Sequence, residues 1–171
     1  MSYLARILES TRTRVAEAKQ RVTVEALEQR LAGIDEPSSL RSALDGQAGV
    51  AVIGEIKRAS PSAGVFDANL SATETAMAYA RGGAAAISVL TEPEFFRGSL
   101  EDITSARAAG LPVLRKDFIL DTWQVLESRA AGADALLLIA RTLERQELEM
   151  LLAACGSLRM DALVEVYDGP R

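Results

Sequence analysis

Hydrophobic positions in residues 1–46 recur at helical spacing and include no run typical of a strand. Charged residues separate them, which predicts that the first helix is amphipathic. A second short helix is predicted over residues 24–32, ended by Gly33, and a loop over residues 35–39 leads to a helical turn at residues 40–44. The first helix is defined by Leu4, Ile7, Leu8, Thr11, Val15 and Ala18. We therefore expect residues 1–46 to form an N-terminal helical extension.

From Val50 onward, short aliphatic or β-branched runs alternate with helical patterns. Capping spacing indicates helix starts at Ser71 and Asp121 and, more weakly, at Ser99. Strands that alternate with helices in this way predict a parallel sheet covered by helices. The predicted helices end near Gly82, Gly110, Gly132 and Gly156, and the five predicted strands cover residues 50–56, 86–90, 113–115, 135–139 and 162–166.

Two parallel-sheet architectures fit this alternation, an open doubly wound sheet and a closed barrel. Five strands would complete an open sheet, whereas a (βα)8 barrel usually takes ~250 residues. However, Glu55 and Lys57 are two apart on one strand, so they share a face that an open sheet would bury under helices. In a barrel they point into the mouth. We therefore predict an α/β fold of the (βα)8 TIM barrel type, truncated after the fifth strand, with residues 47–171 as its first five βα units.

Composition limits the chemistry that the chain can perform. The 171 residues carry a net charge of −5 and include no histidine, which excludes a Ser-His-Asp triad, a Cys-His pair and any histidine-containing metal site. Cys155 is the single cysteine, which excludes an internal disulfide and fits a cytoplasmic protein, and its leucine neighbours indicate a small core residue. The acidic balance and the short apolar runs predict neither a nucleic-acid nor a membrane partner. No metal is expected.

Ionisable residues stand near the carboxyl ends of three predicted strands. Glu55 and Lys57 precede a Ser/Pro/Gly loop of the kind that presents backbone N–H groups to anions. Lys116 ends the third strand, with Phe118 two residues later, and Glu165 is flanked by apolar residues of the fifth strand. Taken singly, these residues also fit a surface ion pair, a solvated lysine and a structural carboxylate. Together they place acids and bases at the end of a barrel where active sites are built.

Four motifs give the chain a specific resemblance to a known family. They are Glu55-Ile56-Lys57-Arg58-Ala59-Ser60-Pro61-Ser62, Ser88-Val89-Leu90-Thr91-Glu92 with Phe96-Arg97-Gly98-Ser99, Leu114-Arg115-Lys116-Asp117-Phe118, and Leu163-Val164-Glu165-Val166. In this order they resemble the indole-3-glycerol-phosphate synthase family. The resemblance implies ring closure of 1-(2-carboxyphenylamino)-1-deoxyribulose 5-phosphate to indole-3-glycerol phosphate, with loss of CO2 and water and without a cofactor.

The resemblance also implies roles for individual residues. Lys116 is expected to be the general acid of ring closure and Glu165 the general acid/base of dehydration, with Glu55 as a supporting carboxylate. Lys57 is expected to meet anionic groups of the substrate, and the division of the acid role between Lys57 and Lys116 stays open. The implied substrate-binding residues are Ser60, Phe96 and Phe118, the two aromatic rings serving as apolar walls.

The chain departs from the family pattern after its fifth predicted strand. The family's sixth-strand asparagine, the Glu-Ser-Gly element after the seventh strand and the Gly-rich phosphate loop of the eighth have no counterpart up to Arg171, and Tyr167 stands where the family often has histidine. We therefore expect a fragment that does not catalyse the reaction alone and whose unpaired first and fifth strands permit self-association. The alternatives are an inactive fragment or another phosphate-binding barrel, such as a phosphoribosyl isomerase.

Overall fold

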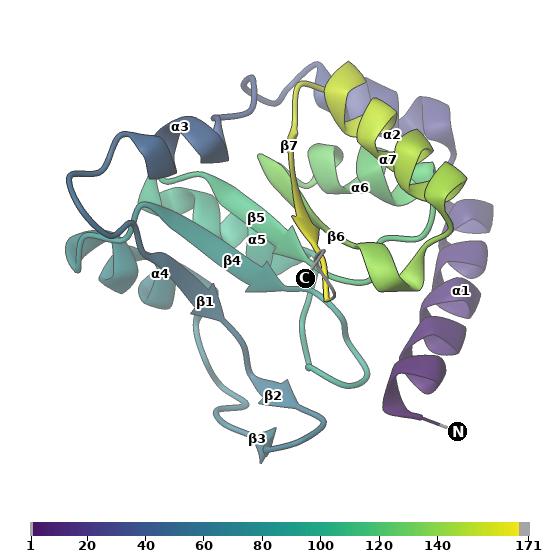
Figure 1. The fold of residues 1–171 in the computed structure, drawn as a ribbon, viewed down its shortest axis with the longest axis horizontal. Helices are drawn as coiled ribbons and strands as arrows, with labels where there is room; N and C mark the ends of the chain where they lie inside the picture. Colours follow the sequence, from purple (N-terminus) through teal and green to yellow (C-terminus); the bar gives the residue numbers. More distant parts are fainter. Residues whose placement is uncertain (1, 168–171) are drawn as a thin grey trace.

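A five-stranded parallel sheet organises the structure, a computed structural model that describes residues 2–167. Across the sheet the strands follow their order in the chain, β1-β4-β5-β6-β7 (Figure 1). Because this order never reverses, the sheet is wound in one direction, as in a barrel and unlike a doubly wound fold. The parallel α/β prediction is thus confirmed, although residues 168–171 of the predicted barrel segment lie outside the described residues. The strands are β1 (Ile53–Ile56), β4 (Ala86–Leu90), β5 (Val113–Lys116), β6 (Ala135–Ile139) and β7 (Asp161–Glu165).

Helices that follow the strands cover the outer face of the sheet. Ile87 and Val89 of β4 belong there to one buried core that also includes residues of all four covering helices. Alternate strand residues face opposite sides, so Ala86 and Leu114 lie on the inner face, where Leu40 packs against them. The covering helices are α4 (Ala72–Arg81), α5 (Glu101–Ala106) with its 3₁₀ continuation η1 (Arg107–Ala109), α6 (Thr122–Ala130) and α7 (Arg145–Ser157), which follows the 3₁₀ turn η2 (Ala140–Thr142).

The three helices predicted for the N-terminal segment are present. They are α1 (Tyr3–Arg21), α2 (Val24–Leu31) and α3 (Leu40–Asp45). Trp123 of α6 packs with apolar residues of α1 and α2, and its indole N–H donates to the Val22 carbonyl at 3.2 Å. The helices α1 and α2 are therefore packed onto the rest of the structure through α6, whereas α3 packs on the sheet through Leu40.

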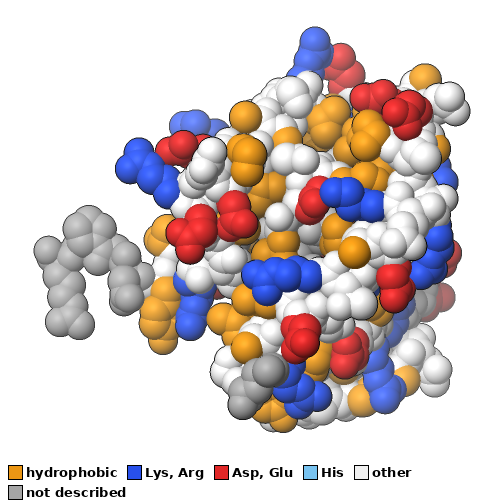
Figure 2. All heavy atoms as spheres, turned by 90° about the vertical axis from the view of Figure 1, so that its right-hand side faces the viewer, with side chains coloured by type: hydrophobic (Ala, Val, Ile, Leu, Met, Phe, Trp, Pro, Cys, Tyr) orange, Lys and Arg blue, Asp and Glu red, His pale blue; other side chains and the backbone are white. Residues whose placement is uncertain are grey.

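Acidic and basic side chains are interspersed over the face that carries α1 (Figure 2). Small hydrophobic patches lie between them. Among the described residues, no helix combines the length and the hydropathy needed to cross a bilayer.

Two of the predicted helix caps form as expected. The Ser71 hydroxyl accepts the Glu74 N–H at 3.3 Å, and Asp121 forms a capping box with Gln124. The third also forms, although α5 begins only after Leu100: the Ser99 hydroxyl accepts the Glu101 N–H at 3.2 Å, and Asp102 accepts the Ser99 N–H at 3.2 Å. Asp102 also forms an ion pair with Arg58, which joins the start of α5 to the segment after β1.

The helix α7 ends at Ser157, next to Gly156 as predicted, and Arg159 after it takes the left-handed conformation, with φ of 56°. One prediction of local structure is wrong. The predicted Ser/Pro/Gly loop contains a small hairpin of β2 (Ala59–Ser60) and β3 (Gly64–Val65). Strands of two residues are too short to show the alternation of apolar and polar residues that identifies a strand, so the sequence pattern did not predict them.

Cys155 lies in the outer core, as its neighbours predicted. Only 2% of the residue is exposed. Burial raises the pKa of its thiol to about 11. The side chain therefore packs as a small hydrophobe in the outer core and is not one of the residues that line the candidate cavity.

Candidate active site

A cavity of about 390 Å³ opens on the inner face of the sheet, at the carboxyl ends of the strands. The pleat brings residues from separate strands to one end, because side chains in register on parallel neighbours face the same side. Every residue predicted for the site except Ser60 lines this cavity. The lining residues are Leu4, Glu55, Lys57, Leu90, Glu92, Phe96, Lys116, Asp117, Phe118, Leu137, Ile139, Arg141 and Glu165.

Glu55 lies between two lysines at the mouth of the cavity. Its carboxylate accepts Lys116 Nζ at 2.7 Å and Lys57 Nζ at 2.9 Å. Burial by itself would raise the pKa of Glu55, but the hydrogen bonds from Lys116 and Lys57 outweigh it and lower the pKa below its ordinary value. Lys57 also lies over the Phe66 ring, 5.3 Å from its centroid. The carboxylate is therefore held ionised between two candidate acids.

Glu165 lines the same cavity but differs from its predicted environment. The sequence places it among apolar neighbours, whereas in the structure Glu165 is exposed, and Leu163 and Val166 are 40% and 65% exposed. The reason is that β7 lies at the edge of the sheet in the described residues, with β6 as its neighbour on one side. The predicted position at the strand end is confirmed, and the predicted burial is wrong.

Ser60 lies outside the cavity. It belongs to β2, and its hydroxyl accepts the Ala63 N–H at 3.2 Å within the hairpin. In this structure Ser60 stabilises the turn between β2 and β3 rather than the cavity wall. Its predicted contact with a substrate stays a prediction.

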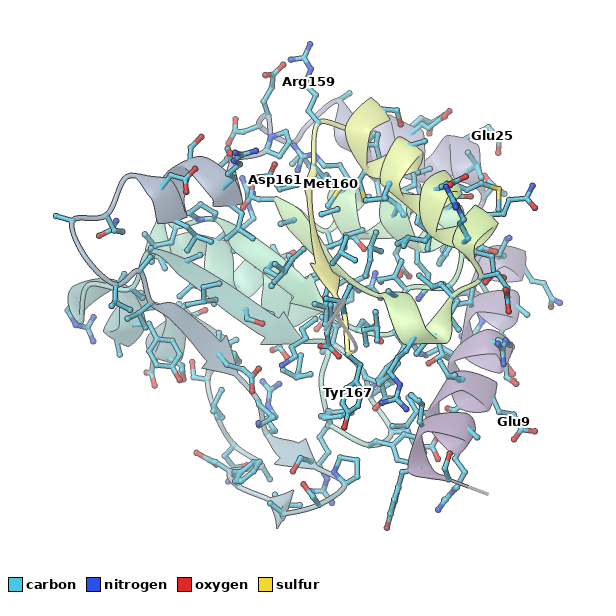
Figure 3. The ribbon with its side chains drawn as sticks, in the orientation of Figure 1. Glu9, Glu25, Arg159, Met160, Asp161 and Tyr167 are labelled. Carbon is cyan, nitrogen blue, oxygen red and sulfur yellow. The ribbon has the colours of Figure 1, made fainter. Side chains whose placement is uncertain are left out.

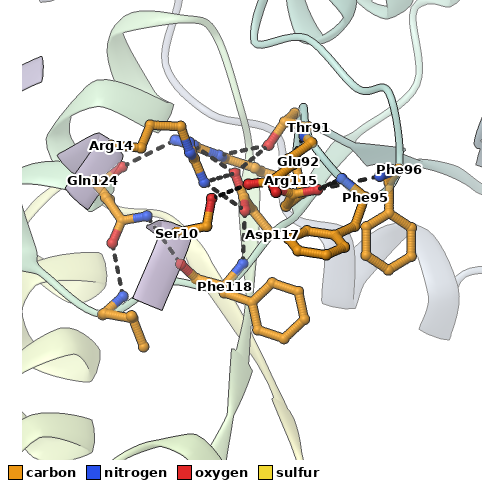
Figure 4. A network of polar contacts seen from close by, with 12 residues as sticks. Ser10, Arg14, Thr91, Glu92, Phe95, Phe96, Arg115, Asp117, Phe118 and Gln124 are labelled. Atoms are coloured by element: carbon orange, nitrogen blue, oxygen red, sulfur yellow. Dashed lines mark hydrogen bonds and ion pairs between the residues drawn. The ribbon is translucent and has the colours of Figure 1, made fainter. Parts of the chain in front are cut away.

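A buried ion network surrounds Asp117, the residue after Lys116 in the sequence (Figure 4). Asp117, whose side chain is fully buried, accepts Arg115 at 2.9 Å, Arg14 of α1 at 3.2 Å and the Thr91 hydroxyl at 2.7 Å. Arg115 also reaches Glu127 of α6 at 2.8 Å. The network thus ties α1, β5 and α6 together at the residue next to Lys116, and the sequence analysis assigned it no role.

Leu4, Glu92 and Arg141 also line the cavity, although no sequence pattern identified them as site residues. Leu4 was identified only as a helix position, and its place in the cavity depends on how α1 lies beside the strand ends. The Arg141 guanidinium stacks on Tyr167, 4.9 Å from the ring centroid, and Figure 3 shows Tyr167 just beyond the end of β7. Within the described residues, no group of three or more acidic or cysteine side chains is arranged to hold a metal ion.

The loop after β4 carries Phe96 and returns close to its own strand. The Gly98 N–H donates to the Glu92 carbonyl at 2.9 Å. A Cβ at Gly98 would overlap the Leu90 carbonyl oxygen and the Thr91 backbone, so only glycine fits.

Gly98→Ala should destabilise the chain by roughly 1–3 kcal/mol, the usual cost of overpacking against backbone that cannot yield. Urea unfolding measures the effect. Gly156→Ala is the matched control, because nothing lies within 4 Å of a Cβ built at this exposed helical position. Equal stability of Gly98→Ala and the unmodified chain would contradict the tight packing of the loop.

Comparison with known proteins agrees with this geometry. The family described as indole-3-glycerol phosphate synthase matches residues 4–170. The chain belongs to this family. It is 54% identical over 123 residues to the indole-3-glycerol phosphate synthase of Desulfosudis oleivorans, a match that covers 71% of the chain and 47% of the relative. It is 45% identical over 168 residues to the synthase of Syntrophobacter fumaroxidans, covering 96% of the chain and 63% of that relative.

Coverage is equally one-sided for the synthase of Mycolicibacterium gilvum, which is 48% identical over 162 residues, 94% of the chain and 59% of the relative. The chain thus spans about half to two thirds of the length of these indole-3-glycerol phosphate synthases. Membership of the synthase family accounts for the parallel α/β fold.

Proposed function

We propose that the chain carries the acid–base residues of an indole-3-glycerol phosphate synthase. In this proposal residues 1–46 are the helical extension and residues 47–171 are the first five βα units of a (βα)8 barrel. The observation that supports the reaction best is the Glu55 carboxylate between Lys57 and Lys116 in a cavity that also contains Phe96 and Phe118. Aromatic walls suit a substrate that carries a benzene ring, which favours the synthase over a phosphoribosyl isomerase.

Ring closure needs an acid at the ketone of the substrate. The ring carbon that bears the carboxylate attacks the ketone carbon, and the ketone oxygen takes a proton as it becomes a hydroxyl. Loss of CO2 then returns the bonding electron pair to the ring and restores its aromaticity. Lys116 is the proposed proton donor, with Glu55 keeping its ammonium in place. Lys57, bonded to the same carboxylate, is proposed to meet the anionic groups of the substrate and to share the acid role.

Dehydration needs one proton delivered and one removed. The new hydroxyl leaves as water with the delivered proton, and the carbon beside the nitrogen loses a proton to complete the double bond of the indole. Glu165, exposed at the cavity and free to exchange protons with water, is the proposed acid/base for this step. Phe96 and Phe118 are proposed to hold the aromatic ring, and Ser60 to bind the substrate from the hairpin after β1.

The proposed function is tested by the appearance of indole fluorescence. The chain is assayed alone and after fusion to the C-terminal third of the Syntrophobacter relative, which supplies the part of the barrel that the match does not cover. We expect turnover by the fusion and little by the chain alone, because positioning of both substrate ends supplies up to ~7–11 kcal/mol of the barrier reduction. A folded fusion without turnover would contradict the proposed function.

Glu165→Gln in the same fusion should lower turnover and leave folding intact, because it preserves shape and removes ionisation. The expected loss is roughly 10²-fold, the contribution of a positioned acid or base. The control is Glu149→Gln, which makes the same chemical change at an exposed position of α7. Glu144 is avoided because it caps the N-terminus of α7. Full turnover and an unchanged pH profile of Glu165→Gln would show that this carboxylate has no part in the chemistry.

The sheet edges support a proposal about association. In the described sheet, β1 and β7 each have one neighbouring strand, and exposed edges recruit further strands. We therefore propose self-association of the chain through these edges, which size-exclusion chromatography would detect as a dimer. A cytoplasmic location and the lack of a nucleic-acid partner stay predictions from composition.

A further inference from the structure

Glu92, directly after β4, is a fully buried carboxylate at the cavity wall. None of its surface is exposed, and it lines the same cavity as Lys116 and Phe96. Its side chain accepts three consecutive backbone N–H groups, from Glu94 at 3.2 Å, Phe95 at 2.6 Å and Phe96 at 3.2 Å. The bonds from Phe95 and Phe96 are visible in Figure 4, where Glu92 faces the backbone of these two residues.

The surroundings of Glu92 oppose its charge. Burial raises the pKa of Glu92 and the nearby Asp117 carboxylate raises it further, while the three backbone bonds lower it. Among the described residues, no lysine or arginine forms an ion pair with Glu92. The loop amides are therefore the groups that compensate its burial, since a buried charge needs hydrogen-bonded partners.

The bonds to Glu92 close the loop at both ends. The side chain holds residues 94–96, and the Glu92 carbonyl accepts the Gly98 N–H at 2.9 Å. Between these points Arg97 takes the left-handed conformation, with φ of 53°. Phe96 thus lies in a short loop, residues 92–98, whose backbone is bonded to Glu92 at both ends. Glutamine would replace one of the two accepting oxygens by an NH2 group, which cannot accept the amide N–H that faces it.

We infer that Glu92 is the positioning residue that fixes Phe96 as the aromatic wall of the cavity. The inference rests on the proposed function for the identity of the ring that Phe96 meets. Glu92 acts through the loop backbone and needs no contact with the substrate. Its loss should therefore loosen the wall and weaken binding of an aromatic ligand, while the sheet and its lysines stay in place.

The test compares Glu92→Gln with Glu94→Gln in the full chain. Glu94 lies on the same loop, is exposed and contacts Ser10 of α1, so the control makes the same chemical change without touching the three bonds. Amide exchange by NMR reports on residues 94–96 and on β4. Binding of anthranilate, a fluorescent aminobenzoate used as the probe, reports on the aromatic wall.

We expect Glu92→Gln to speed exchange of the three amides by about tenfold or more and to weaken anthranilate binding by about tenfold, with β4 exchange unchanged. Glu94→Gln should alter neither. Unchanged exchange in Glu92→Gln would overturn the inference, as would faster exchange with unchanged anthranilate affinity. If Glu92→Gln does not fold, Glu92→Asp, which retracts the carboxylate by one CH2, should give the same pattern.

The two proposals fail in different ways. If the unmodified chain does not bind anthranilate, the proposed substrate class is contradicted, and the exchange rates alone then decide whether Glu92 holds the loop. If the chain binds anthranilate and Glu92→Gln leaves both measurements unchanged, the proposed function survives and Glu92 loses its positioning role.

Discussion

Replacing Lys116 by methionine in the fused barrel should lower the turnover number by roughly 10²-fold or more, the range for a positioned general acid. Methionine keeps the length and apolar stem of the side chain but cannot donate a proton. Glu55 would still be held by Lys57 at 2.9 Å, so the cavity should keep its shape. Steady-state kinetics by indole fluorescence gives the turnover number and KM separately, and the larger change is expected in turnover.

Lys19→Met provides the control for this substitution. Lys19 makes the same type of contact, an ion pair with Asp121 at 2.8 Å, but on the exposed side of α1. Its replacement should leave turnover unchanged. A turnover number for Lys116→Met equal to that of the unmodified fusion would remove Lys116 from the mechanism.

Asp117→Asn should reduce the free energy of unfolding of the chain by about 3–5 kcal/mol, the cost of removing one partner from a buried ion pair. Arg115, 1% exposed, would lose its carboxylate at 2.9 Å, and Arg14 would lose the contact that holds α1 to β5. Thermal unfolding measures the loss. Asp45→Asn, in the exposed pair with Arg41, should leave Tm nearly unchanged.

The effect of Asp117→Asn should depend on pH with a defined sign. Burial alone would raise the pKa of Asp117, but Arg115, Arg14 and the Thr91 hydroxyl lower it below its ordinary value. The stability that ionised Asp117 contributes is therefore complete above the unfolded-state pKa of about 4 and is lost as pH falls through the lower folded-state pKa. A stability difference between the chain and Asp117→Asn that grew as pH fell below 4 would contradict the ionised network.

The sheet and the grouping of Glu55, Lys57, Lys116 and Glu165 were predictable from short-range periodicity, whereas the acid–base roles proposed for these residues rest on the resemblance to the family. A strand pleat places Glu55 and Lys57 on one face, and strand ends collect Lys116 and Glu165 at one edge. These inferences need only the positions of the strands and the knowledge that the strands are parallel. The apolar runs indicate the positions, and their alternation with helices indicates the parallel arrangement. The structure bears out the shared cavity for all four residues.

Other parts of the site depend on packing that no local pattern encodes. The ion pair between Arg14 and Asp117 joins residues that are 103 positions apart in the sequence. It forms because α1 lies beside the end of β5, which no local pattern indicates. In the sequence Glu92 is indistinguishable from any acidic residue at the end of a strand. Its role depends on the loop after β4, whose backbone N–H groups donate to it. The exposure of Glu165 follows from the position of β7 at the sheet edge, which periodicity alone does not specify.

The sharing of Glu55 by two lysines leaves a charge imbalance at the mouth of the cavity. Two ammonium groups and one carboxylate sum to a single positive charge, so each ammonium has only half a counter-ion. An anion that paired with one of these lysines would displace Glu55 from that lysine only, and Glu55 would keep its ion pair with the other. Because all three side chains are roughly one third exposed, such an exchange would not open a fully buried salt bridge.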